Sequence, residues 1–311
     1  MKKGFKSKKA SKINIGKSLI ILIIIISSFV LTFKCLTKIF LKNISKEEYV
    51  KYITSNSFGN GKSKFKVNSI SSLLKSSFGI NKINTKEVIS EINKNNQEEI
   101  IEQPTKKEPL VYIYNSHQGE EYKSNYLETF NIKNNVLIAS FILKEYLSVI
   151  EIDAYVEENS VADILHTNGW KYNASYKASR ILMENAKKNI PSLEYFIDLH
   201  RDSSPYNVTT TNIDNENYAR ILFVIGLENP SYEKNLVFAT KLNEEINKKY
   251  PTLSRGIIKK QGKRVNGVYN QDFSPNTILI ELGGQYNTIE EVNNTLKILS
   301  KEIASYINGV K

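Results

Sequence analysis

The stretch Tyr195-Phe-Ile-Asp-Leu-His-Arg-Asp202 joins an apolar run to a cluster of polar side chains. Two other stretches have the same form. Leu110-Val-Tyr-Ile-Tyr114 precedes Asn115-Ser-His-Gln-Gly-Glu-Glu-Tyr122, and Thr277-Ile-Leu-Ile280 precedes Glu281. Short apolar runs of this kind predict buried strands. Polar residues at the carboxyl ends of strands are where an open α/β sheet places its chemistry. The three clusters therefore predict one site.

The region from Pro109 to Lys311 is long enough for one well-buried domain. Strand-like runs alternate in it with segments that have apolar residues three and four positions apart. This alternation predicts an α/β fold with a mostly parallel sheet and helices on both faces. The predicted strands are 110–114, 151–156, 195–199, 220–225 and 277–282, and the predicted helices are 135–149, 172–189, 232–249 and 288–307.

His117 and His200 are two of only three histidines in the chain, and each follows a predicted strand. Two imidazoles and a carboxylate from neighbouring strand ends can hold a catalytic zinc ion with one position left for water. Each histidine could instead form only a local hydrogen bond. Nearby acidic residues at both positions favour the metal site.

The amino terminus predicts a membrane anchor. Residues 1–17 carry seven lysines and no acidic residue, which is most of the formal net charge of +11. The high charge is therefore weak evidence for nucleic-acid binding, and we expect no nucleic-acid partner. Residues 18–33 carry no charge and would span about 24 Å as a helix, somewhat less than a bilayer core of about 30 Å. Flanking lysines can reach the interface, so we assign a single-pass transmembrane anchor to 18–41.

A cleaved signal peptide is the competing interpretation. It requires a cleavage site between small residues, and Phe29 to Thr37 offers no convincing one. The positive-inside rule places tail 1–17 in the cytoplasm and residues 42–311 outside the cell membrane. Residues 42–108 are rich in polar residues and end in a charged stretch, which predicts a stalk or linker before the catalytic domain at 109–311.

Seven motifs in residues 110–311 occur in the order typical of the stage II sporulation protein P family, which this region resembles. That family consists of membrane-anchored N-acetylmuramoyl-L-alanine amidases. The motifs are Tyr112-Ile-Tyr-Asn-Ser-His-Gln-Gly-Glu-Glu-Tyr122, Ser175-Tyr-Lys-Ala-Ser-Arg180, Asp198-Leu-His-Arg-Asp202, Gly226-Leu-Glu-Asn-Pro230 with Asn235-Leu236, Leu253-Ser-Arg-Gly-Ile257, Tyr269-Asn-Gln-Asp272 and Leu279-Ile-Glu-Leu-Gly-Gly-Gln-Tyr-Asn-Thr288. One departure is Asn115, where the family often has a histidine, so this residue cannot be an essential ligand here.

The resemblance implies a zinc amidase that hydrolyses the bond between muramic acid and the stem peptide of peptidoglycan. Its metal ligands would be His117, His200 and a carboxylate. Glu120 aligns with the acid of the family motif and is preferred over Glu121. Glu281 matches the family's catalytic glutamate, and burial at a strand end would raise its pKa and favour proton transfer.

Four further residues are candidates for substrate binding or for orienting the ligands. Asp202 could orient an imidazole. Arg180 and Arg255 could bind carboxylates of the stem peptide, and Arg201 follows a ligand directly, although each arginine could equally form a structural ion pair. His166 is expected in a surface loop, outside the metal site.

The resemblance also implies a role in septal wall thinning and engulfment during sporulation. The partners it implies are a lytic transglycosylase and the membrane scaffold of the engulfment machinery. Two other functions stay open from the residues alone. The same metal ligands could serve a zinc peptidase that cuts within the stem peptide, or the domain could be an inactive amidase-like wall-binding module.

The anchor predicts a defined topology. In intact cells, a tag placed after Lys311 should be digested by added protease, whereas the lysine-rich tail should be protected. Amino-terminal sequencing of the mature protein provides the control. A mature chain that starts near residues 35–45 would contradict the anchor and indicate a cleaved signal peptide.

Overall fold

A computed structural model describes residues 46–57, 108–123 and 133–309. These residues belong to one compact unit, Ser45–Glu128 with Ile132–Lys311. The predicted tail, the predicted anchor and most of the predicted stalk lie outside the described residues. Within the described part, no helix combines the length and apolarity needed to cross a bilayer.

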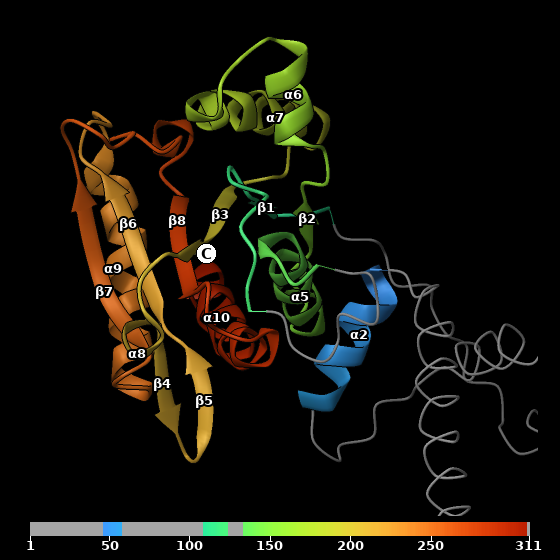
Figure 1. Ribbon diagram of the computed structural model, residues 1–311, viewed down its shortest axis with the longest axis vertical. Helices are drawn as coiled ribbons and strands as arrows, with labels where there is room; N and C mark the ends of the chain where they lie inside the picture. Colours follow the sequence, from blue (N-terminus) through green and yellow to red (C-terminus); the bar gives the residue numbers. More distant parts are fainter. Residues whose placement is uncertain (1–45, 58–107, 124–132, 310–311) are drawn as a thin grey trace, which may run out of the picture. The chain divides into compact units, whose positions relative to one another are not determined.

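The fold is mixed α/β with a six-stranded sheet in the order β2-β1-β3-β8-β6-β7 (Figure 1). Strands β2, β1, β3 and β8 are parallel, β6 is antiparallel to β8, and β7 is parallel to β6. The elements in chain order are α2 (Lys46–Ser57), β1 (Val111–Tyr114), α5 (Val136–Val149), β2 (Ala154–Val156), α6 (Val161–Thr167), η2 (Tyr172–Ala174), α7 (Ser175–Asn189), β3 (Tyr195–Asp202), α8 (Tyr206–Thr209), β4 (Thr210–Ile213), β5 (Glu216–Ala219), β6 (Ile221–Gly226), α9 (Tyr232–Lys249), β7 (Ser254–Lys260), η3 (Gln271–Phe273), β8 (Thr277–Gly284) and α10 (Ile289–Gly309).

The predicted mostly parallel sheet is confirmed, and the five predicted strands correspond to β1, β2, β3, β6 and β8. The four predicted helices correspond to α5, α7 with its leading η2 turn, α9 and α10. Central strands were predictable because both of their faces are buried, which leaves continuous apolar runs in the sequence. All four residues of β1, for example, are buried.

Three strands were not predicted, and all three are polar and partly exposed. Strand β7 is at the sheet edge and has mostly intermediate exposure. Strands β4 and β5 form a separate hairpin whose turn residues, Asp214 and Asn215, both have positive φ. The favoured two-residue hairpin turn requires positive φ at both central residues, a conformation that aspartate and asparagine adopt. The Asp214-Asn215 pair was therefore the sequence signal for this hairpin.

Successive side chains of β3 point to opposite faces of the sheet, and helices pack against both faces. Phe196 packs with Met183 and Ala186 of α7 in one apolar cluster. Tyr195 points to the opposite face, where its ring lies 5.9 Å from that of Phe238 in α9 and 6.3 Å from that of Tyr306 in α10.

Asn235 of α9 ties the helix to the start of β8. Its side chain is fully buried and donates to the carbonyl oxygens of Ser274 at 2.8 Å and Thr277 at 2.9 Å. Its own oxygen accepts a hydrogen bond from Asn229. These contacts satisfy carbonyl groups that would otherwise be costly to bury. They fix the strand that carries Glu281.

Candidate metal centre

His117, Glu120 and His200 lie together at the carboxyl ends of β1 and β3. The two imidazoles each place Nδ1 3.5 Å from an oxygen of Glu120, His117 facing Oε1 and His200 facing Oε2. The three potential ligand atoms all lie within 4.8 Å of one another. The carboxylate therefore lies between two nitrogen donors, an arrangement compatible with a metal ion.

The parallel pairing of β1 and β3 brings these residues together. Tyr114 is in register with Asp198, so the turn after β1 begins beside the end of β3. Asn115 fixes this turn because its side-chain amide donates to the carbonyl oxygen of Leu199 at 2.6 Å. It is almost fully buried. Asn115 thus has a structural role here, consistent with its exclusion as a ligand.

Asp198 orients His200. Its Oδ1 lies 2.9 Å from Nε2 of the imidazole and also accepts the backbone N–H of Ser116 at 2.9 Å. The Ser116 hydroxyl donates to the other Asp198 oxygen at 2.8 Å. The N–H at Nε2 of His200 then donates to Asp198. Nδ1, which faces Glu120, is left as the ring nitrogen that can bind a metal ion.

The electrostatics of His200 and Glu120 reflect these contacts. Burial alone would lower the pKa of His200, but the Asp198 and Glu120 carboxylates raise it well above its usual value. Burial would raise the pKa of Glu120, but its contacts with His117 and His200 lower it well below its usual range. Glu120 is therefore ionised at neutral pH, as a metal ligand must be.

The structure brings Glu120, not Glu121, to the two histidines. Glu121 is exposed, and its carboxylate pairs with Lys133 at 2.6 Å. The Glu120 carboxylate also accepts the backbone N–H of Arg201 at 2.9 Å. Adjacent residues in an extended segment point in opposite directions, which explains why only one of the two acids reaches the site.

Glu281 lies beside the cluster on β8, in register with His200. Its Oε2 is buried and has no hydrogen-bond partner among the described residues. Burial, together with the nearby Glu120, Asp202 and Asp198 charges, raises the pKa of Glu281 to about 7, although His200 opposes the shift. A carboxyl group with this pKa can both accept and release a proton near neutral pH.

The remaining predicted site residues already have protein partners. Arg180 pairs with Asp272 at 2.9 Å. Arg255 pairs with Asp202 at 2.6 Å, and Arg201 donates from Nε to the carbonyl oxygen of Glu121 at 3.0 Å. Asp202, expected to orient an imidazole, instead binds Arg255, and Asp198 is the carboxylate that contacts Nε2 of His200. The sequence signal for Asp198 was its position two residues before His200, on the same face of the strand.

Two tyrosines that were not predicted as site residues contact the histidines. The Tyr172 ring stacks on His117 with a centroid distance of 5.0 Å, and this tyrosine is 63% exposed. The Tyr176 ring lies 5.4 Å from His117 and 6.5 Å from His200. Their spacing of four residues, at the start of a predicted helix, was the signal for a shared face.

His166 does not lie in a loop as expected. It occupies the last turn of α6, where it is exposed. The seven-residue helix was missed because it is short, although Ser160 caps it by accepting from the backbone N–H of Asp163. His166 is not among the three clustered metal-ligand candidates, which agrees with its expected place outside the metal site.

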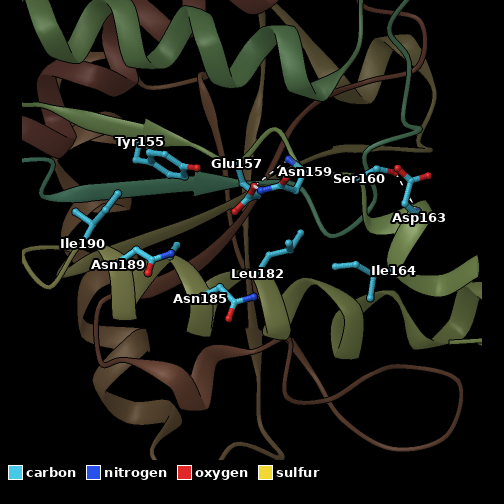
Figure 2. Close-up of a pocket in the computed structure, with 11 residues that line it drawn as sticks. Tyr155, Glu157, Asn159, Ser160, Asp163, Ile164, Leu182, Asn185, Asn189 and Ile190 are labelled. Carbon is cyan, nitrogen blue, oxygen red and sulfur yellow. Dashed lines mark hydrogen bonds between the residues drawn. The ribbon is translucent and has the colours of Figure 1, made fainter. Parts of the chain in front are cut away.

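A cavity of about 390 Å³ lies between the segment after β2 and helix α7 (Figure 2). Gln118, next to His117, connects this segment to the metal centre by donating to the carbonyl oxygen of Asn159 at 2.8 Å. Both oxygens of the cavity's buried Glu157 accept hydrogen bonds, one from Tyr112 and the other from Asn159. None of the predicted site residues lines this cavity.

Sequence comparison identifies the family. The family model of Stage II sporulation protein P (SpoIIP) matches residues 37–304, most of the chain. The chain belongs to this family. Stage II sporulation protein P of Bacillus subtilis (strain 168) is 33% identical over 204 residues, which are 64% of this chain and 51% of that protein. The chain thus spans about half the length of this relative.

Two solved structures show limited similarity. Cwp6 from Clostridium difficile is 15% identical, with a TM-score of 0.38, over 64% of this chain and 29% of that one. The CwlD amidase from Clostridioides difficile, solved in complex with the GerS lipoprotein, is 12% identical, with a TM-score of 0.41, over 64% of this chain and 98% of that one.

The cluster predicts one metal ion per chain. It also predicts that Glu120, but not Glu121, contributes to metal affinity. The chain should bind one divalent metal ion, with zinc as the probe, and Glu120→Gln should weaken binding of this probe by at least about a hundredfold, because even outer partners of a ligand contribute about 10- to 100-fold. Glu121→Gln is the matched control and should leave the zinc Kd unchanged. Competition with a chromophoric chelator measures both. Equal effects of the two substitutions would show that the ligand is misassigned.

Proposed function

We propose that this chain is a zinc-dependent N-acetylmuramoyl-L-alanine amidase that removes stem peptides from peptidoglycan. The observation that carries the proposal is the His117–Glu120–His200 cluster beside buried Glu281. Membership of the SpoIIP family supports a role in the cell wall during sporulation. Two imidazole nitrogens and one carboxylate oxygen are a ligand set that zinc uses in hydrolases, with a fourth position left open.

The substrate bond is the amide between the lactyl carbonyl of muramic acid and the nitrogen of L-alanine. His117, Glu120 and His200 would hold the metal, and Asp198 would fix the tautomer of His200. Bound zinc would supply Lewis acidity, which polarises the carbonyl and makes water easier to deprotonate. This amide is stable, so both effects are needed for hydrolysis at neutral pH.

Glu281 would carry the proton. In this mechanism its carboxylate takes a proton from the attacking water, whose oxygen forms a bond to the carbonyl carbon. The carbon–nitrogen bond then breaks, and Glu281 delivers the proton to the departing nitrogen. The products are a lactyl carboxylic acid and a stem peptide with a free amino terminus. In the metal-free site, burial raises the pKa of Glu281 to about 7, and a buried carboxyl group of this kind suits both proton transfers.

The proposed location is the outer face of the cell membrane, with residues 18–41 as the single-pass anchor. Peptidoglycan is outside the membrane, so the catalytic domain must be on that side to reach it. A lytic transglycosylase and the membrane scaffold of the engulfment machinery remain the proposed protein partners. A transglycosylase cleaves the glycan strand, and the two activities together would dismantle both components of the wall.

The reaction can be tested by the mass of its products. The full chain in detergent, incubated with purified peptidoglycan, should release stem peptides that begin with free L-alanine and leave peptide-free glycan strands. A chelator should abolish release, and added zinc should restore it. Fragments cut within the stem would indicate the peptidase alternative. Wall binding without any release would indicate an inactive binding module.

Glu281→Gln should lower turnover by about 10²- to 10⁴-fold, the usual size of a general acid–base contribution. Zinc content should stay at the wild-type level because Glu281 is not one of the three clustered ligands. Turnover and elemental analysis on the same preparation measure both effects. Glu194→Gln, an exposed carboxylate just before β3, is the control. Loss of zinc would make Glu281 a ligand, and near-normal turnover would place the base elsewhere.

A further inference from the structure

Helix α2 packs on the domain although residues 58–110 separate it from β1 in the sequence. The side chains of Tyr49, Val50, Ile53 and Thr54 are buried, each at most 6% exposed. A helix of only 12 residues is marginal by itself in water. Its contacts with α5 and α10 therefore account for much of its stability.

Tyr49 makes the most specific contact between α2 and the domain. Its hydroxyl donates to Oδ1 of Asn134 at 2.6 Å, and both residues are buried. Another polar contact of α2 joins Lys46 to Glu158 at 2.9 Å, between side chains that are about half exposed. Exposed ion pairs contribute little, whereas a buried hydrogen bond is costly to break.

Asn134 belongs to a short segment that pairs with the Glu120 turn. The backbone N–H of Tyr122 donates to the carbonyl oxygen of Asn134 at 2.7 Å. The backbone N–H of Val136 donates to the carbonyl oxygen of Glu120 at 3.1 Å. Tyr49 thus contacts the side chain of a residue whose backbone holds the metal-ligand turn in place.

We propose that α2 positions the Glu120 carboxylate for metal binding, with Tyr49 as a positioning residue that acts through Asn134. The idea rests on the proposed function because it assigns Glu120 to the metal. A segment from the amino-terminal part of the chain then sets the geometry of the catalytic centre. Any force or partner that moves α2 changes the fraction of molecules whose Glu120 is in place, and apparent metal affinity falls with that fraction.

Removing the Tyr49 hydroxyl tests the inference in the full chain. Tyr49→Phe keeps the buried ring and removes the hydroxyl that donates to Asn134. The first measurement is hydrogen exchange of the metal-free chain at the amides of Tyr122 and Val136. We expect exchange there to be about three- to tenfold faster, the size of one lost hydrogen bond. The second is zinc affinity by chelator competition, with Kd raised by a similar factor.

Thr54→Val is the matched control. Thr54 is buried on the same helix, and its hydroxyl donates to the carbonyl oxygen of Val50 within α2. This variant should leave both exchange rates and the zinc Kd at wild-type values.

Unchanged exchange at Tyr122 and Val136 in Tyr49→Phe overturns the inference. Equal acceleration in Thr54→Val also overturns it, because α2 would then act only through general stability. If the unaltered chain binds no zinc, the proposed function fails separately. The exchange result, obtained without metal, still decides whether α2 holds the Glu120 turn.

Discussion

The carboxylate of Asp198 joins the ends of the two strands from which the site is built. It binds Nε2 of His200 on its own strand and both the backbone and the hydroxyl of Ser116 after β1. One buried group therefore fixes the relative position of the two histidine-bearing segments and the orientation of one imidazole. Its burial is tolerated because each of its oxygens is hydrogen-bonded. The geometry of the candidate metal centre therefore depends on this contact.

The charges around this contact explain why the site suits a cation. Asp198, Glu120 and Glu281 are three carboxyl groups that lie around two imidazoles. In the metal-free site, burial and repulsion by the neighbouring carboxylates raise the pKa of Glu281. The carboxylates of Asp198 and Glu120 raise the pKa of His200. A divalent cation between the histidines and Glu120 would relieve this excess of negative charge. Glu281 would stay off the metal and near enough to exchange protons with water.

The sequence allowed prediction of the parts whose signal is local. Central strands have continuous apolar runs. His117 lies in the turn after β1, and His200 lies near the end of β3, after its apolar run. The contact of Asp198 with Ser116 was harder to predict, because it depends on which strand lies beside β3. Strand β7 and the β4–β5 hairpin lacked apolar patterns because they are partly exposed. The contact of Tyr49 with Asn134 spans 85 residues, and no spacing rule covers such a distance.

Helix α2 also changes how the amino-terminal region is understood. Residues 42–108 were expected to form a stalk or linker, in which a short helix near Lys46–Ile53 is plausible, and α2 lies at this position and packs on α5 and α10. With the anchor at residues 18–41, as proposed, only residues 42–45 would separate it from α2. In the sequence, the helix nearest the proposed anchor would then be the one that, by our inference, positions Glu120. Attachment to the membrane and assembly of the metal site would in that case share one structural element.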